Sequence, residues 1–266
     1  MAADFTYTLK TETVSFKYAR GVSDRSGREF HPFHEILLFL DGNAEFISES
    51  CHIRPQPGMV LLIPKEAYHQ LILHGEPTDY QRCVLQFSDT PELLPLIGRK
   101  LTAVSALQAV GELRYLFGKL IRRAEAAEGD AALLIKSVLA LLLDALPAAR
   151  ETASSDHPQN ERIRCAIEYI NRHPDGKLPI GDIAAACHVS VSSLSHLFRE
   201  EMNISIHQFI LKKRLICAHQ RIAAGEAATA AAAECGFQDY SGFYKQYKKL
   251  FGFSPSHKCA AGGERG

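Results

Sequence analysis

The chain of 266 residues has no apolar run close to the roughly eighteen residues that a membrane-spanning helix needs. Its first residues, 1–5, contain no basic stretch followed by an apolar one, so no secretory signal is visible. The seven cysteines are scattered and never spaced as CxxC, which favours reduced thiols over a disulfide framework. We therefore expect a cytoplasmic protein that makes no contact with a membrane.

Catalytic motifs are also lacking. The sequence contains no glycine-rich phosphate loop, no GxSxG elbow and no HExxH pair. Because no set of residues forms a recognisable catalytic constellation, we expect that the protein is not an enzyme and needs no cofactor.

Charge is distributed unevenly along the chain, although the formal net charge is zero. Residues 1–160 carry 16 Lys and Arg against 20 Asp and Glu, whereas residues 161–266 carry 14 against 10. The change from a net −4 to a net +4 indicates that only the C-terminal part meets a polyanion.

Short apolar segments separated by turn residues fill the chain from about residue 5 to residue 89. The clearest of them are residues 36–40, 44–47, 59–63, 69–72 and 83–87. Several short strands at regular spacing predict an antiparallel barrel or sandwich.

Helical periodicity follows over residues 102–146 and predicts two helices, 102–127 and 131–146. The second is apolar over much of its circumference, so it must bury two sides. We expect this helix pair to form a homodimer interface that buries Leu134, Val138 or Leu142. The polar stretch 148–160 predicts a linker.

The C-terminal part contains an internal repeat, in which residues 194–205 match residues 243–254 at an offset of 49. The apolar positions coincide, and Asn203 falls opposite Gly252, two residue types that tolerate a left-handed helix end. A short helix is predicted before each copy, at 180–187 and at 228–235.

This pattern predicts two helix-turn-helix units joined by a helix at 206–224. Two such units on one rigid helix can place their recognition helices in successive major grooves, about 34 Å apart. Because the helix at 228–235 is rich in alanine, we expect it to bury little and to be easily loosened.

The residues of the second unit have a familiar spacing: Arg214-Leu215, Ala218, Ile222, Ala232, Cys235-Gly236-Phe237, Phe243, Tyr247-Lys248, Phe251-Gly252 and Ser254-Pro255. On these residues the chain resembles the DNA-binding domain of the AraC/XylS family of transcriptional regulators. The N-terminal part is similar to the cupin-like sensor of the same family at His31, Glu35, Gly42, Pro57-Gly58, Ile63-Pro64 and His69.

The resemblance implies an α+β protein of several domains. It implies a cupin-like β-barrel for effector sensing at 1–100, a helical dimerisation segment at 101–147, a linker at 148–160 and a DNA-binding domain with two helix-turn-helix units at 161–260. Its implied partners are double-stranded DNA, a small-molecule effector, a second copy of the chain and, in activation, RNA polymerase.

The resemblance also assigns DNA contacts. The implied base-reading residues are Ser192, Ser195, His196, Tyr240, Ser241, Tyr244 and Lys245. Independently of the resemblance, the positive charges in and beside the repeat lead us to expect phosphate contacts from Arg199, Lys212, Lys248 and Lys249.

Four polar residues of the N-terminal part, His31, His34, Glu35 and His69, invite two interpretations. Imidazole and carboxylate groups suit zinc, iron or manganese, but His31 and His34 are three residues apart and would face opposite sides of a strand. We expect His31, Glu35 and His69 to line an effector pocket, with no metal bound.

Two other classes of protein stay open at this point. One is a metal-dependent cupin enzyme fused to a DNA-binding domain, which metal analysis and a turnover assay would distinguish. The other is a regulator that acts without a ligand or under the control of phosphorylation, which the absence of a phospho-receiver pattern disfavours.

Overall fold

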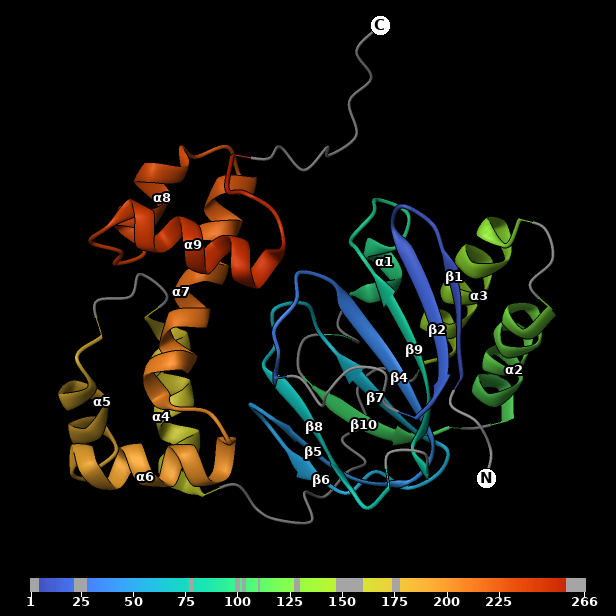
Figure 1. The fold of residues 1–266 in the computed structure, drawn as a ribbon, viewed down its shortest axis with the longest axis horizontal. Coiled ribbons are helices and arrows are strands. Elements are labelled where there is room, and N and C mark those ends of the chain that lie inside the picture. The colour runs from blue at the N-terminus through green and yellow to red at the C-terminus, as the bar shows by residue number, and fades with distance from the viewer. Residues whose placement is uncertain are drawn as a thin grey trace, which may run out of the picture. The chain divides into compact units, whose positions relative to one another are not determined.

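The computed structural model describes residues 5–21, 28–76, 79–98, 101, 104–109, 111–126, 130–146, 160–173 and 178–256 (Figure 1). The chain divides into two compact units, residues 1–159 and residues 160–266. Apart from Asn160, the linker predicted at 148–160 lies outside the described residues. Within them, no helix combines the length and the hydropathy needed to cross a membrane.

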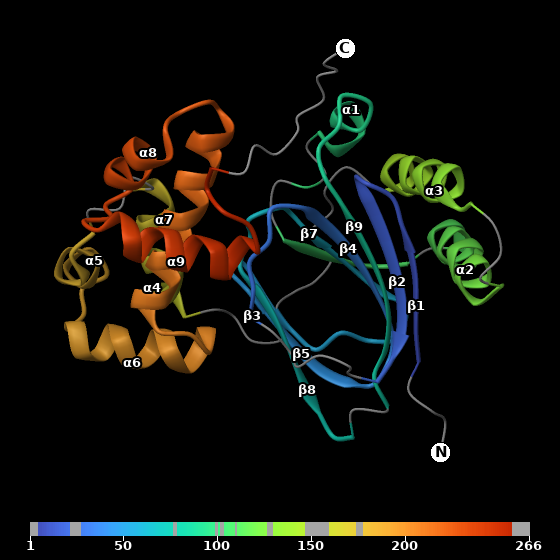
Figure 2. The ribbon, with the colours of Figure 1, turned by 45° about the horizontal axis from the view of Figure 1, so that its top comes forward.

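Two antiparallel sheets form the N-terminal unit and face each other (Figure 2). The large sheet has the order β1 (Phe5–Lys10), β2 (Val14–Arg20), β9 (Gln81–Phe87), β4 (His34–Asp41), β7 (Met59–Ile63) and β10 (Ser105–Gln108). The small sheet has the order β3 (Arg28–Glu29), β8 (His69–His74), β5 (Asn43–Ser48) and β6 (His52–Ile53). The predicted β-rich, cupin-like domain is confirmed, although no strand pairing among the described residues joins the sheets into a closed barrel.

Alternation along β4 gives the large sheet two apolar faces. Leu37 and Phe39 pack with residues of the small sheet in one core, whereas Ile36 and Leu38 point to the opposite side and belong to a second core. Because successive side chains of a strand point to opposite faces, polar residues at the odd positions of β4 also point between the sheets.

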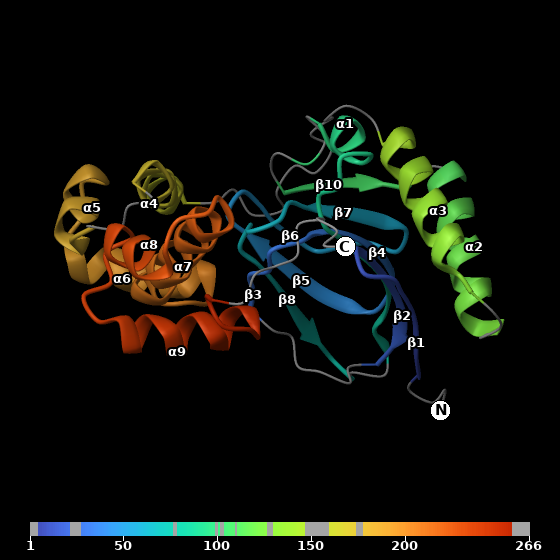
Figure 3. The same cartoon turned by 90° about the horizontal axis from the view of Figure 1, so that it is seen from above.

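Helices α2 (Gly111–Ala126) and α3 (Ala132–Ala145) cover the other face of the large sheet, alongside β1 and β2 (Figure 3). Val138 and Leu142 are 2% and 1% exposed within this core. The expectation that they form a dimer interface is therefore wrong, because the second apolar side of α3 packs against the sheet of its own chain.

The segment before α2 also differs from its prediction. Residues 105–108 form β10, an edge strand paired with β7, and not the start of a helix. Val104 and Leu107 are apolar because they are buried against the sheet. A short helix, α1 (Leu94–Ile97), lies earlier in the chain.

The C-terminal unit is helical and contains α4 (Glu161–Arg172), α5 (Ile180–Ala186), α6 (Val191–Met202), α7 (Ile206–Ala223), α8 (Ala228–Glu234) and α9 (Tyr240–Phe251). Helices α5 and α6 form one helix-turn-helix, α8 and α9 form another, and α7 connects them. The two predicted helix-turn-helix units are confirmed.

Capping residues define the ends of α6 and α9, the second helices of the two helix-turn-helix units. Ser190 accepts a hydrogen bond from the backbone N–H of Ser193 at 3.1 Å and so caps α6. The helices α6 and α9 end at Asn203 (φ 49°) and Gly252 (φ 81°), both in the left-handed conformation. The predicted left-handed helix ends are confirmed.

The alanine-rich helix α8 is not loosely packed. Ala231 and Ala232 are 0% and 2% exposed and contact a core that includes Leu215, Phe243 and Tyr247. The prediction that this helix buries little is wrong, because small side chains let α8 approach α7 and α9 closely and large aromatic side chains from α9 fill the remaining space.

Candidate DNA interface and sensor cavity

The first recognition helix, α6, buries one face and exposes another. Leu194 and Phe198 are fully buried, whereas Ser192, His196 and Arg199 are exposed. The structure therefore places three of the predicted DNA-contacting residues of this helix on its outer side.

Two side chains on this face already have partners within the protein. The hydroxyl of Ser195 donates to the carbonyl oxygen of Val191 at 2.8 Å, and the residue is half-buried. The imidazole of His196 lies 3.6 Å from the carboxylate of Glu200, and its side chain is 78% exposed. His196 is therefore better presented to a partner than Ser195.

The second recognition helix, α9, has the same division. Tyr240, Ser241 and Lys245 are exposed, and Tyr244 is half-buried. In the last turn, Lys248 and Lys249 are exposed, where their charge also suits the negative end of the helix dipole. Lys212, on α7, is half-buried.

Asp239 caps α9, a role that the sequence analysis did not assign. Its carboxylate accepts from the backbone N–H groups of Ser241 at 3.1 Å and Gly242 at 2.6 Å. A side-chain carbon at Gly242 would lie 3.0 Å from that carboxylate, so a larger residue at this position would require the capping side chain to shift. The signal was present, since Asp is a preferred residue directly before a helix.

The turns of both units share one hydrogen-bond pattern. The backbone N–H of Val189 donates to the carbonyl of Ala184, and that of Phe237 to the carbonyl of Ala232, each at 3.0 Å. The residue before each donor has a positive φ, 56° at His188 and 80° at Gly236. His188 thus adopts the conformation that its glycine counterpart adopts without steric cost.

The N-terminal unit contains a cavity of about 180 Å³ between its sheets. Polar and apolar side chains from both sheets line it: Lys17, Glu35, Leu37, Phe46, His69, Leu71, Tyr80, Arg82, Val84 and Gln86. Glu35 and His69 were predicted to line a pocket, whereas Lys17, Arg82 and Gln86 were missed. These three polar residues alternate along their strands in step with apolar core residues, and this pattern could have predicted that they point into the unit.

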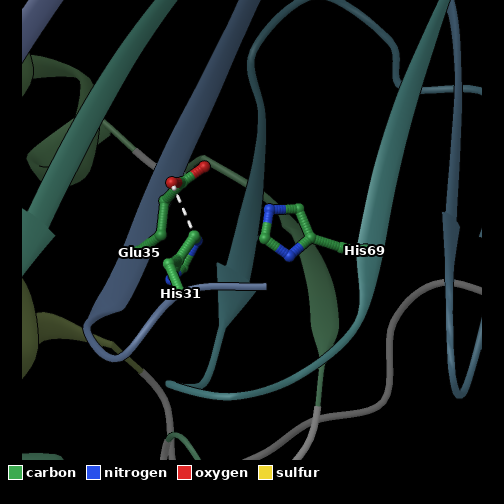
Figure 4. A group of neighbouring side chains, drawn as sticks. All are labelled: His31, Glu35 and His69. Atoms are coloured by element: carbon green, nitrogen blue, oxygen red, sulfur yellow. Dashed lines mark ion pairs between the residues drawn. The ribbon is translucent and has the colours of Figure 1, made fainter. Parts of the chain in front are cut away.

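His31, Glu35 and His69 lie close together although their elements are distant in sequence (Figure 4). Glu35 and His69 line the cavity, whereas His31 lies beside Glu35 and does not line it. Glu35 lies on β4, His31 precedes that strand, and His69 begins β8. All three are buried, and Nε2 of His31 lies 3.4 Å from Oε2 of Glu35. The same carboxylate oxygen accepts from Nε2 of Gln86 at 2.9 Å.

The environment of Glu35 favours its charged form. Burial by itself raises the pKa of this carboxyl, but hydrogen bonding to His31 and the proximity of His69 and His31 outweigh it and lower the pKa. The group is therefore a carboxylate near neutral pH.

His34 does not join this cluster. Its Nε2 lies 2.9 Å from Oδ1 of Asp89, and its Nδ1 accepts from the backbone N–H of Lys65 at 3.1 Å. Burial lowers the pKa of His34, and Asp89 offsets part of this effect. His34 and Glu35 are neighbours on a strand, and their side chains have different partners, as alternation requires.

Two family models match separate parts of the chain. Residues 14–143 match an AraC-like ligand binding domain, and residues 183–258 match a helix-turn-helix domain. The chain is 26% identical over 238 residues to a probable transcriptional regulator, LumQ, of Photobacterium leiognathi, which covers 85% of this chain and 89% of that protein.

Other relatives match over a smaller part. The arabinose operon regulatory protein of Escherichia coli K12 is 32% identical over 144 residues, which is 53% of this chain and 49% of that protein. Among solved structures, ToxT from Vibrio cholerae O395 matches with 12% identity and a TM-score of 0.40 over 96% of this chain and 95% of that chain.

A β-rich ligand-binding domain followed by two helix-turn-helix units defines a DNA-binding transcriptional regulator. The chain belongs to the AraC/XylS family of these regulators.

Proposed function

We propose that this regulator reads two adjacent segments of one DNA face with α6 and α9, and that a small molecule bound between the two sheets controls this activity. The observation that carries the proposal is the repeat itself: two helix-turn-helix units with the same turn hydrogen bond and the same left-handed helix end. Footprinting on the DNA upstream of its own gene, with and without small metabolites, tests the whole proposal.

In this proposal base edges are read by Ser192, Ser195, His196, Tyr240, Ser241, Tyr244 and Lys245, and phosphates are bound by Arg199, Lys212, Lys248 and Lys249. The exposure of His196 and Lys245 supports their place in the first group, and that of Arg199, Lys248 and Lys249 supports theirs in the second. Because the Ser195 hydroxyl is held by the helix backbone, its contribution to base reading would be the smallest of the group.

The effector would be a small polar anion. The cavity volume of about 180 Å³ is below the roughly 300 Å³ of typical drug-sized sites, so the ligand would be small. Lys17 and Arg82 contribute two cationic groups to its lining, whereas Glu35 contributes one carboxylate. An excess of cationic groups favours an anionic ligand.

The regulator would act as a homodimer through the outer side of α3. Leu133 and Leu141 are 79% and 52% exposed, and a spacing of eight residues places them on the same face of the helix. In this proposal Leu133 and Leu141 form the dimer interface. Val138 and Leu142 do not, because they pack inside their own chain.

We assign the chain a cytoplasmic location and no catalytic role, in keeping with the regulatory proteins that it resembles. Contact with RNA polymerase would follow binding next to a promoter. Transcription from the footprinted DNA with purified polymerase tests this step.

A further inference from the structure

We propose that His31, Glu35 and His69 bind one divalent transition-metal ion at the edge of the cavity between the two sheets. This inference concerns metal binding and not the regulation of transcription. It does not rest on the proposed function, because the test below measures binding of the ion itself. Two imidazoles and one carboxylate form a donor set suited to zinc, iron, manganese or cobalt.

The three side chains already lie close to the geometry of such a site. One donor atom from each lies within 4.8 Å of the others, and the residues are only 8%, 3% and 4% exposed. Donors at about 2.0–2.2 Å from one ion lie roughly 3–4.4 Å apart, depending on the angle between them. Small rotations of the side chains therefore close the set around an ion.

Hydrogen bonds to the backbone orient both imidazoles for metal binding. Nδ1 of His31 lies 2.7 Å from the carbonyl oxygen of Phe33, and Nδ1 of His69 lies 3.2 Å from that of Ala67. Because a carbonyl oxygen only accepts, each Nδ1 must carry the hydrogen, and Nε2 of a neutral ring keeps its lone pair. Metal-binding histidines in proteins typically donate their second N–H in this way.

The electrostatics of the cluster call for a cation. If both rings are neutral, two nitrogen lone pairs and a carboxylate meet in a buried space, an arrangement that is costly unless a positive charge lies among them. Arg82 does not provide it, because its guanidinium lies 4.7 Å from the Tyr80 ring centroid and donates to the carbonyl of Gly21. A metal ion held by the three side chains would balance the charge of Glu35.

The surroundings also support the donor set. Gln86 donates to Glu35 and so holds the carboxylate from the side of β9, as partners of metal-binding carboxylates do. Three protein ligands leave coordination positions vacant. Since Glu35 and His69 line the cavity, those positions would be accessible to a small molecule inside it.

The test uses the full chain, stripped with a chelator and titrated with Co²⁺ near pH 7.5, while visible absorption and heat of binding are recorded. We expect one equivalent of Co²⁺ per chain, displacement by Zn²⁺ and a rise in melting temperature on binding. Glu35→Gln and His69→Gln should each weaken Co²⁺ binding about 100-fold or more, since even outer partners of metal ligands cost 10- to 100-fold.

A histidine outside the cavity provides the matched control. His74 lies 3.5 Å from Glu45 and is 44% exposed, so His74→Gln removes an imidazole beside a glutamate without touching the cavity. This variant should bind Co²⁺ like the parent. Circular dichroism of each variant shows whether it is folded, and Glu35→Gln keeps the shape of the side chain that it replaces.

Three results would overturn the proposal. They are the absence of stoichiometric Co²⁺ binding to the parent chain, unchanged binding by folded Glu35→Gln and His69→Gln, and loss of binding in His74→Gln.

Discussion

Replacing Ala231 by Ile should destabilise the second helix-turn-helix unit by about 1–3 kcal/mol. Ala231 is fully buried in the core that α8 forms with α7 and α9. Ile adds three carbon atoms where Leu215, Phe243 and Tyr247 already occupy the space, so α8 must move away from α7 or the rings must leave their preferred rotamers.

The size of the effect follows from the size of the unit. For a unit of about 100 residues, each 1 kcal/mol lowers the melting temperature by roughly 4–8 °C, so the variant should melt about 5–20 °C lower. DNA binding should also weaken, because a shift of α8 changes the angle at which α9 is held. In footprints, the protection due to α9 should be lost before that due to α6.

Ala230→Ile is the matched control, since this neighbour makes the same chemical change on the exposed side of α8. This control should lower the free energy of unfolding by only the few tenths of a kcal/mol by which Ile differs from Ala in helix propensity. Calorimetry and hydrogen exchange over residues 226–245 measure both variants. An Ala231→Ile protein that melts like Ala230→Ile and binds DNA as tightly as the parent would refute the argument.

Four further substitutions test the proposed roles of single residues. His196→Ala should weaken binding to the preferred DNA about tenfold and relax preference at one or two base pairs; equal weakening on all sequences in a binding-site selection would make it a phosphate contact. Lys248→Ala should reduce the slope of log affinity against log salt by about one, and an unchanged slope would place Lys248 away from DNA. Asp239→Ala should cost about 1 kcal/mol in urea unfolding, because α9 loses its cap, whereas unaltered stability would show that solvent replaces the cap fully. Leu133→Glu should convert dimers to monomers in sedimentation experiments without lowering the melting temperature, and a dimer that persists would move the interface to another surface.

The internal repeat made the C-terminal unit predictable from the sequence. The caps and turns of a helix-turn-helix depend on residues within a few positions of one another, such as the left-handed ends at Asn203 and Gly252. Local interactions of this kind can be predicted directly from the order of residues. The residues expected on the exposed faces of α6 and α9 came from the resemblance to the family.

Packing between helices was harder to predict. The alanines of α8 gave the impression of a weakly packed helix, because a sequence shows the size of a side chain but not the distance to its neighbours. The tertiary structure brings Phe243 and Tyr247 against Ala231, so the small residue marks a close approach. The same limitation affected α3, whose second apolar side packs on β1 and β2, which lie more than 100 residues earlier in the sequence.

The amino-acid sequence by itself determined the order of the elements, the two helix-turn-helix units and the polar residues available to a sensor. The resemblance placed His31, Glu35 and His69 in one pocket, but only the tertiary structure decided which of their atoms face one another, because β4 and β8 lie in different sheets. Period-two alternation gives the face on which a side chain lies, but it does not give the strand that stands opposite. The physical reason is that sheet pairing is a long-range choice, settled by the burial of both apolar faces of the large sheet at once.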